Sequence, residues 1–120
     1  MYWFTADEHY GHTKVIEYCH RPFNSIEEMD ISIIAQHNLV VSSEDVVIHA
    51  GDFCWCNKKE DAFRRYVQKL NGSHIFLKGS HDHWLPDSAK YMWRKMFDQQ
   101  LIVVCHYAMR TWERSHYNSW

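Results

Sequence analysis

The sequence predicts an α/β fold, because segments typical of strands alternate with segments typical of helices along its 120 residues. Four β-prone or apolar segments predict strands, at residues 2–6, 45–52, 74–80 and 101–106. Three segments with helical signals separate them, at residues 24–41, 58–72 and 87–97. This alternation predicts a largely parallel sheet covered by helical layers. In such sheets ligands bind beyond the carboxyl ends of the strands, so the residues after each strand are the first candidates for a functional site.

The first two predicted elements have clear local signals. The run YWFTA at residues 2–6 is β-prone, because aromatic and β-branched residues favour strands. Ser25 and Glu28 form the S-x-x-E capping box, which satisfies amide groups at a helix start. Apolar residues then recur with approximately helical spacing, which predicts a helix over residues 24–41.

Glycines and cap residues bound the later elements. The buried-type strand DVVIHAGD and the strand HIFLKGS both run into a glycine. Gly72 is placed as the C-terminal stop of the helix over residues 58–72. Asp87 or Ser88 can cap the helix predicted over residues 87–97, and the apolar run LIVVCH completes the series.

Composition and charge argue against several kinds of partner. The net charge is -2 with histidine neutral, so the chain lacks the broad positive field that duplex nucleic acid needs. We expect no membrane span and no signal peptide, because no apolar run is long enough. Four cysteines without zinc-finger spacing predict reduced thiols and a cytoplasmic protein. The 16% aromatic content fits an aromatic core or aromatic walls around a flat ligand, and both alternatives stay open.

Each predicted strand is followed by a carboxylate, a histidine or both. The segments concerned are Asp7-Glu8-His9, Gly51-Asp52, Gly79-Ser80-His81-Asp82 and His106. Any one of these groups could be a turn cap or a surface residue, but four consecutive cases indicate a shared site at one edge of the sheet. Mixed carboxylate and imidazole ligands suit Mn, Fe, Zn or Ni better than Ca. Asp52, with two carboxylate oxygens, could bridge two cations.

On these motifs the chain resembles the calcineurin-like metallophosphoesterases, and most closely their small bacterial and phage-type members. That family has the ordered motifs D-x-H, G-D, G-N-H-D/E, a lone H and G-H-x-H. The runs WFTADEHYGH and HYAMRTW also resemble this subgroup. The resemblance implies an α/β/β/α sandwich. Ser80 stands where the family has asparagine, and no G-H-x-H motif occurs before Trp120. We therefore expect residues 1–120 to form a single metallophosphoesterase-like domain that is C-terminally incomplete.

The resemblance also implies a dinuclear metal site and a reaction. Two divalent metal ions, Mn, Fe, Zn or Ni, would be bound. Asp7, His9 and Asp52 would hold the first ion, and Asp52, Ser80 and His106 the second. A bridging hydroxide would attack the phosphorus of a phosphodiester or a phosphomonoester.

Three further residues receive roles from the resemblance. His81 would act as general acid for the leaving oxygen, and Asp82 would orient the His81 ring. His12 would contact the substrate phosphate, although a surface loop histidine explains it equally well. A nucleotide is among the candidate substrates.

A second interpretation comes from a different class of function. The altered Ser80 and the missing motif would also fit a catalytically impaired metal- or phosphate-binding homologue, or a fragment of a longer phosphoesterase. In either case the strands missing after Trp120 would leave apolar sheet surface uncovered. We therefore expect self-association through that uncovered sheet.

Overall fold

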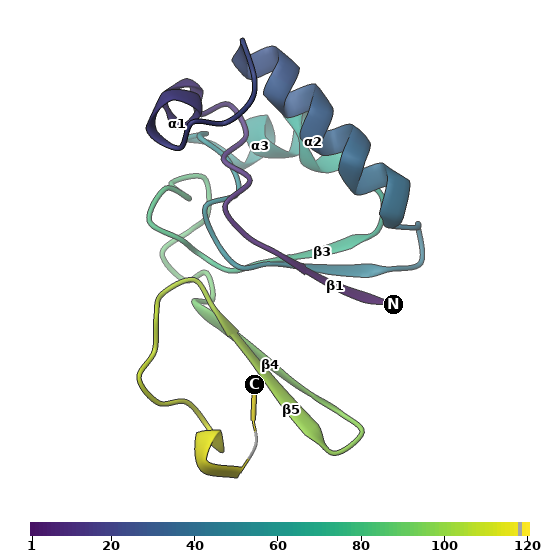
Figure 1. The fold of residues 1–120 in the computed structure, drawn as a ribbon, viewed down its shortest axis with the longest axis vertical. Helices are drawn as coiled ribbons and strands as arrows, with labels where there is room; N and C mark the ends of the chain where they lie inside the picture. The colour runs from purple at the N-terminus through teal and green to yellow at the C-terminus, as the bar shows by residue number, and fades with distance from the viewer. Residues whose placement is uncertain (118) are drawn as a thin grey trace.

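A three-stranded parallel sheet carries the candidate site. The computed structural model describes residues 1–117 and 119–120. The strands are β1 (Tyr2–Thr5), β2 (Val46–His49) and β3 (Ser73–Phe76), in the order β1-β2-β3. The segments that connect them contain α1 (Thr13–Tyr18), α2 (Ile26–Val40), α3 (Lys59–Arg65) and the 3₁₀ helix η1 (Val67–Lys69). Figure 1 shows these helices on one side of the sheet.

Most elements agree with the sequence-based prediction. The first three predicted strands and the helix over residues 24–41 are confirmed. The Ser25 hydroxyl accepts a hydrogen bond from the Glu28 amide (3.1 Å), which confirms half of the capping box. The Glu28 carboxylate accepts from the Asn24 amide rather than from Ser25 (2.8 Å). The predicted helix over 58–72 is shorter, because α3 gives way to η1 before Gly72, whose φ is +98°. Helix α1 was not predicted.

The predicted helix over residues 87–97 is wrong. This segment contains β4 (Met92–Phe97), which pairs in antiparallel register with β5 (Gln100–Cys105) through a two-residue turn. Asp98 occupies the left-handed conformation in that turn (φ 52°), which is a common place for aspartate. The fourth predicted strand therefore belongs to a second, antiparallel sheet and not to the parallel one.

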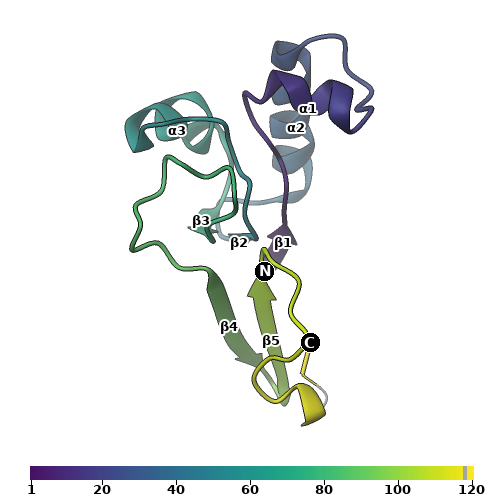
Figure 2. The same cartoon turned by 90° about the vertical axis from the view of Figure 1, so that its left-hand side faces the viewer.

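Aromatic packing explains why the β4 segment forms a strand. Trp93 and Phe97 lie four positions apart in β4. Every second residue of a strand points to the same side, so the two rings share one face of the strand. Both contact the Tyr2 ring of β1, with centroid distances of 6.1 and 5.0 Å, and Trp93 also packs on Phe4. This tertiary contact selects the period of two over the helical period. In Figure 2 the hairpin lies on the side of the parallel sheet opposite the helices.

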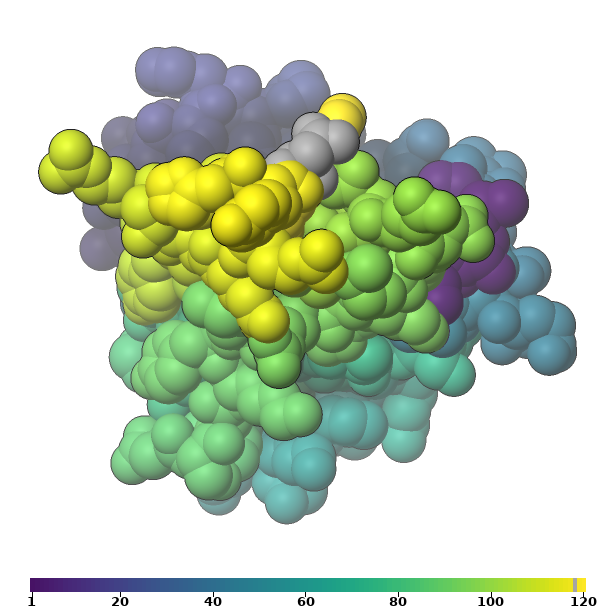
Figure 3. Space-filling view, turned by 90° about the horizontal axis from the view of Figure 1, so that it is seen from below, coloured from purple at the N-terminus to yellow at the C-terminus, as the bar shows by residue number. Residues whose placement is uncertain are grey.

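The fold thus combines parallel and antiparallel sheets with helices, which agrees with the expected α/β class. The edge of β5 remote from β4 is paired with the end of the chain. The Val103 amide donates to the Trp120 carbonyl (2.6 Å), and the Trp120 amide donates to the Leu101 carbonyl (3.0 Å). A short 3₁₀ helix, η2 (Ser115–Tyr117), precedes this contact. Figure 3 views the molecule from below Figure 1 and shows the β4–β5 hairpin and the C-terminal segment covering that face.

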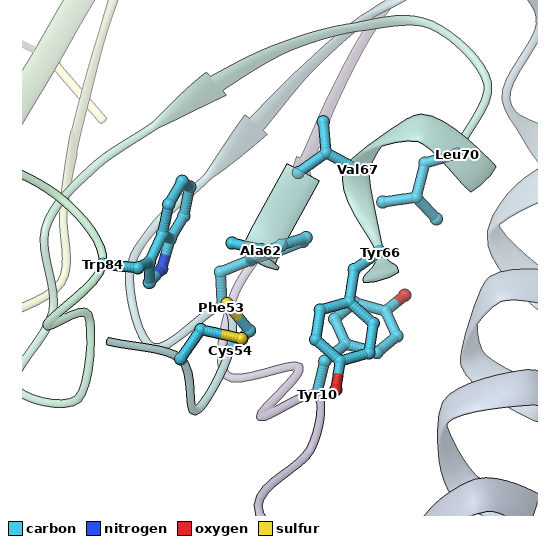
Figure 4. Packing of buried hydrophobic residues seen from close by; sticks show 9 residues of the cluster. Tyr10, Phe53, Cys54, Ala62, Tyr66, Val67, Leu70 and Trp84 are labelled. Atoms are coloured by element: carbon cyan, nitrogen blue, oxygen red, sulfur yellow. The ribbon is translucent and has the colours of Figure 1, made fainter. Parts of the chain in front are cut away.

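The hydrophobic core packs between the parallel sheet and its helices and is rich in aromatic rings (Figure 4). Tyr10 stacks on Tyr66 at a centroid distance of 5.0 Å, and Phe53 contacts Trp84 at 5.7 Å. Tyr10 and Phe53 are each only 1% exposed, and they directly follow His9 and Asp52. Burying a side chain such as Phe53 contributes roughly 1.5–3 kcal/mol. The core therefore anchors both segments immediately after their candidate site residues.

The CxC pair belongs to this core. Burial raises the pKa of the Cys54 and Cys56 thiols, so both stay protonated at neutral pH. Both side chains thus pack as small apolar groups of the core.

A buried carboxylate, Asp45, lies at the opposite end of the parallel sheet from the candidate site. The Asp45 carboxylate accepts hydrogen bonds from the terminal ammonium of Met1 (2.7 Å), the Trp3 indole (2.9 Å) and the Ser42 amide (2.9 Å). These donors, with the ammonium contributing most, hold the pKa of Asp45 well below its usual range. A carboxyl group of lowered pKa stabilises the folded state above its unfolded pKa, and this contribution is lost as the pH falls.

Candidate metal centre

The candidate residues converge on one oxygen atom, Oδ2 of Asp52. The His81 Nδ1 atom lies 2.8 Å from it, and the Nε2 atoms of His9 and His106 each lie 3.6 Å from it. The Ser80 hydroxyl lies 3.4 Å from both carboxylate oxygens. Asp52 itself is only 4% exposed. Residues that follow β1, β2, β3 and β5 therefore meet at one edge of the fold, as the strand ends predicted.

Among the residues that the structure describes, two groups of three side chains could each hold a metal ion, and Asp52 belongs to both. One group is His9, Asp52 and His81, and the other is Asp7, Asp52 and His106. Within each group, one ligand atom per residue lies within 4.8 Å of the other two. The shared Asp52 agrees with the expected bridging carboxylate.

The other members are grouped differently from the expectation. We expected Asp7 with His9, and Ser80 with His106, whereas the geometry joins Asp7 to His106 and His9 to His81. The distinction is small, because the Asp7 Oδ1 atom lies 3.9 Å from His9 Nε2 and 4.0 Å from His106 Nδ1. Ser80 lies beside both groups, and its hydroxyl is 3.0 Å from His81 Nδ1.

Three of these candidate ligands have an unusual backbone conformation. Asp7, His9 and Asp52 have φ angles of 58°, 57° and 56°, in the left-handed region that residues other than glycine rarely adopt. Two hydrogen bonds hold the turns together, from the Asp7 amide to the Gly51 carbonyl and from the His9 amide to the Asp52 carbonyl (both 3.0 Å). Strain of this kind concentrates at functional sites, where the surrounding structure maintains it.

Arg21 supports the first of these turns, and the sequence carries no signal that would single it out. Its guanidinium donates to the carbonyl oxygens of Asp7 (2.6 Å) and Glu8 (2.7 Å). These carbonyls belong to the peptide groups that link Asp7 to Glu8 and Glu8 to His9, so the two bonds help to fix the turn in which Asp7 and His9 are left-handed.

Two glycines make the close approach of the loops possible. A Cβ atom at Gly79 would lie 2.3 Å from Asp52 Oδ1 and 2.5 Å from the Asp52 amide nitrogen. Gly51 has a φ of +97°, and a Cβ atom there would lie 2.5 Å from the His106 ring. Any side chain at either position would displace a candidate ligand.

The protonation states suit metal binding. Burial lowers the pKa of His9, against the opposing effect of the Asp52 carboxylate, and burial also lowers the pKa of His12. The His106 Nδ1 atom faces the Ala50 carbonyl at 3.0 Å and must donate to it, so the neutral ring keeps its lone pair on Nε2, toward Asp52. Burial acts to raise the pKa of Asp52, but hydrogen bonds from the His81 amide and ring hold it below its usual value. The site thus offers imidazole nitrogens around a carboxylate, and such a donor set fits divalent transition metals.

Asp82 does not orient the His81 ring, contrary to our expectation. Its carboxylate, 1% exposed, accepts from the backbone amides of Asp52 (2.7 Å), Gly79 (2.8 Å) and Phe53 (2.9 Å). It also accepts from the Trp84 indole (3.0 Å). The side chain is thus turned into the protein, where it ties the loop after β3 to the loop after β2. The His81 ring contacts Asp52 and Ser80 instead.

A cleft of about 700 Å³ opens beside the convergent residues. His9, Asp52 and His81 line it together with His12, Lys14 and Trp55. His12 stacks on the Trp55 ring at a centroid distance of 4.4 Å, and its Nδ1 atom lies 3.0 Å from that of His9. Trp55 was not predicted as a site residue. Aromatic rings therefore lie both in the core and at the cleft.

Comparisons with known proteins show a family and a fold that this chain is similar to. The family model described as calcineurin-like phosphoesterase matches residues 2–117. The uncharacterised protein MJ1445 of Methanocaldococcus jannaschii is 38% identical over 77 residues, which are 64% of this chain and 44% of that protein. The solved structure of AQ665, a protein of unknown function from Aquifex aeolicus, superposes with a TM-score of 0.71 over 97% of this chain and 66% of its own, at 23% identity. That last likeness shows the fold alone. The chain thus spans less than half the length of the curated relative.

Proposed function

The chain belongs to the calcineurin-like phosphoesterase family, and on that premise we propose that it hydrolyses phosphodiesters or phosphomonoesters at a dinuclear metal centre. The convergence of two metal-capable groups on the single carboxylate of Asp52 is the observation that supports this most. Residues 1–120 would form one domain.

Four candidate ligands would hold the metal ions. Asp52 would be shared between two ions, with Asp7, His9 and His106 as further ligands and the Ser80 hydroxyl beside the second ion. Divalent ions bound there would supply positive charge for the phosphoryl oxygens and lower the pKa of the attacking water. Mn, Fe, Zn and Ni all match this donor set.

Side-chain exposure supports His81 as the group that faces the substrate. The His81 side chain is 38% exposed and lines the cleft, whereas those of His9 and His106 are 11% and 14% exposed. We assign to His81 the donation of a proton to the leaving oxygen. His12, and with it Lys14, would bind the phosphate at the mouth of the same cleft.

Replacing His81 by alanine tests this role. His81 lies within reach of His9 and Asp52, but the proposal does not count it as a ligand. His81→Ala should therefore retain its metal ions yet turn over about 10²–10⁴-fold more slowly, the range typical of a lost acid or base. The loss should shrink for substrates with good leaving groups, because these depart without a proton. Turnover of a series of aryl phosphate esters, with metal content measured in parallel, provides the readout. His83→Ala, two residues further on at the exposed surface, is the matched control. Equal losses for good and poor leaving groups would contradict the assignment.

The function itself is tested by hydrolysis of bis(4-nitrophenyl) phosphate and of 4-nitrophenyl phosphate. We expect activity with added Mn²⁺ that a chelator removes. A protein that binds metal tightly but hydrolyses neither ester would instead support the second candidate, an impaired metal- or phosphate-binding homologue or a fragment of a longer phosphoesterase. Ser80 favours this candidate, because a neutral hydroxyl is a weaker ligand than the asparagine amide that the family has at this position.

The remaining features of the proposal concern partners and location. A phosphate ester, with nucleotides among the candidates, would be the substrate. Within residues 1–117 and 119–120, no helix is long and apolar enough to cross a membrane. Four free cysteines support a cytoplasmic location.

Exposed apolar side chains on β1 and β4, namely Phe4 (47%), Met92 (45%) and Met96 (43%), support self-association. A purely monomeric mass in light scattering would contradict that last point.

A further inference from the structure

Glu8 lies between two candidate metal ligands but its side chain points into the protein. The residue is 8% exposed, whereas the Asp7 side chain is 56% exposed. Glu8 Oε1 lies 2.6 Å from Nδ1 of His49, which is itself 1% exposed. Neither residue takes part in the chemistry proposed above, so this buried contact needs an explanation of its own.

The contact continues across the sheet. The Nε2 atom of His49 lies 2.9 Å from Nδ1 of His74. Glu8 follows β1, His49 is the last residue of β2, and His74 lies in β3. These are the three segments that continue into the candidate ligands. The hydrogen-bonded chain of Glu8, His49 and His74, which we call the brace, therefore connects all three segments on the inner side of the site.

The brace is packed rigidly on its inner side. Phe76 stacks on the His49 ring at a centroid distance of 4.7 Å, and Phe53 meets the ring edge-on at 5.0 Å. The His37 ring of α2 lies 5.6 Å from that of His74. Aromatic packing on several sides leaves the His49 ring one orientation, with one nitrogen toward Glu8 and the other toward His74.

Keeping these polar groups in the interior has a cost. Among the residues that the structure describes, Glu8 Oε2 is buried without a hydrogen-bond partner. Burial, together with the charge of His49, lowers the pKa of His74 to about 4, so this ring is neutral at neutral pH. Apolar side chains would fill the same space without unpaired polar atoms. The stability of the core alone therefore does not account for the brace.

The strained turn at Asp7-Glu8-His9 does account for it. Asp7 and His9 both have left-handed backbone conformations, and such a turn relaxes unless it is held from several sides. Arg21 holds its carbonyl oxygens. The Glu8 side chain holds the middle of the turn against β2. We propose that the brace is a positioning device, which fixes Asp7 and His9 against Asp52 and thereby sets the geometry of the metal centre.

The effect of the brace on Mn²⁺ affinity rests on the proposed metal centre, whereas its effect on the turn does not. Glu8→Met keeps the length of the side chain but breaks the contact with His49, and Mn²⁺ affinity by titration calorimetry should fall about 10–100-fold, the range seen when groups that orient metal ligands are removed. Glu8→Gln keeps an oxygen for His49 and should restore most of the affinity. Asp45→Asn is the matched control, because Asp45 is an equally buried carboxylate (8% exposed) at the far end of β2. It should leave Mn²⁺ affinity unchanged.

Amide hydrogen exchange in the metal-free protein tests the brace independently of metal. The amides of Asp7 and His9 bond to the carbonyls of Gly51 and Asp52, so their exchange reports the turn directly. Glu8→Met should accelerate both amides beyond the change in global stability, whereas Asp45→Asn should change them only through global stability. If Glu8→Met does not fold, His74→Phe, which breaks only the outer link, should give the same effect in smaller size.

The outcomes separate the two proposals. Wild-type protein that binds no Mn²⁺ would remove the proposed function, while the exchange data would still decide the brace. Equal exchange of the two amides in the Glu8 and Asp45 variants would overturn the brace, as would wild-type Mn²⁺ affinity in Glu8→Met.

Discussion

Asp52→Asn is expected to abolish metal binding and hydrolysis together. The substitution keeps the shape of the side chain but removes the negative charge on which His9, His81 and His106 converge. Both metal-capable groups lose their shared member, so Mn²⁺ affinity should fall by more than the roughly 100-fold that marks the loss of a merely orienting group. Elemental analysis and titration calorimetry on the purified variant measure this directly.

A surface variant provides the comparison. Asp87→Asn removes a carboxylate whose side chain is exposed and which pairs with Lys78 at 3.2 Å. It should behave like the wild type in metal content and turnover. Unchanged metal stoichiometry in Asp52→Asn would remove the shared-carboxylate arrangement from the account.

Asp82→Ala is expected to cause the largest loss of stability. Its carboxylate accepts from three backbone amides and one indole in the interior, and alanine would leave all four donors without a partner. Leaving several buried donors unpaired should cost about 3–5 kcal/mol in the free energy of unfolding. Denaturant unfolding followed by circular dichroism measures that free energy.

Asp82→Asn is a more specific test of the same structural role. Asp82→Asn keeps one acceptor oxygen but places an NH₂ group against N–H donors, since both carboxylate oxygens accept in the wild type. We expect a stability loss close to that of Asp82→Ala. Had Asp82 served mainly to orient His81, both variants would unfold normally and only turnover would fall, and that result would refute the structural role.

The location of the site could be predicted from the sequence, because parallel strands deliver their following residues to one edge. Asp7, Asp52 and His81 were found in this way. His106 lies beside Asp52 at the end of an antiparallel strand, so the residue reaches the candidate site although the element that carries it was placed in the wrong sheet.

The β4 strand and the role of Asp82 could not be predicted, for two physical reasons. The MWRKMF segment has no decisive period of its own, and its packing on Tyr2 and Phe4 selects the strand. The Asp82 contacts run to backbone amides about 30 positions earlier in the chain, which leave no mark in the sequence.

The brace and the cleft wall were missed for a related reason. Glu8 lies between Asp7 and His9 in the chain. Its side chain points into the protein, and this orientation follows only from the left-handed turn. His49 is 1% exposed within β2, but one of its partners, Glu8, follows β1 and the other, His74, lies in β3. Trp55 is adjacent to core cysteines in sequence, yet it lies 48% exposed at the cleft.

Anomalous diffraction from crystals grown with Mn²⁺ tests the central claim most directly. The account predicts two manganese peaks about 3.5–4 Å apart, with the Asp52 carboxylate between them. One ion should be bound by residues that include His9 and the other by residues that include His106. A folded protein with no anomalous peak at the Asp52 carboxylate, at Mn²⁺ concentrations that support hydrolysis, would contradict the account.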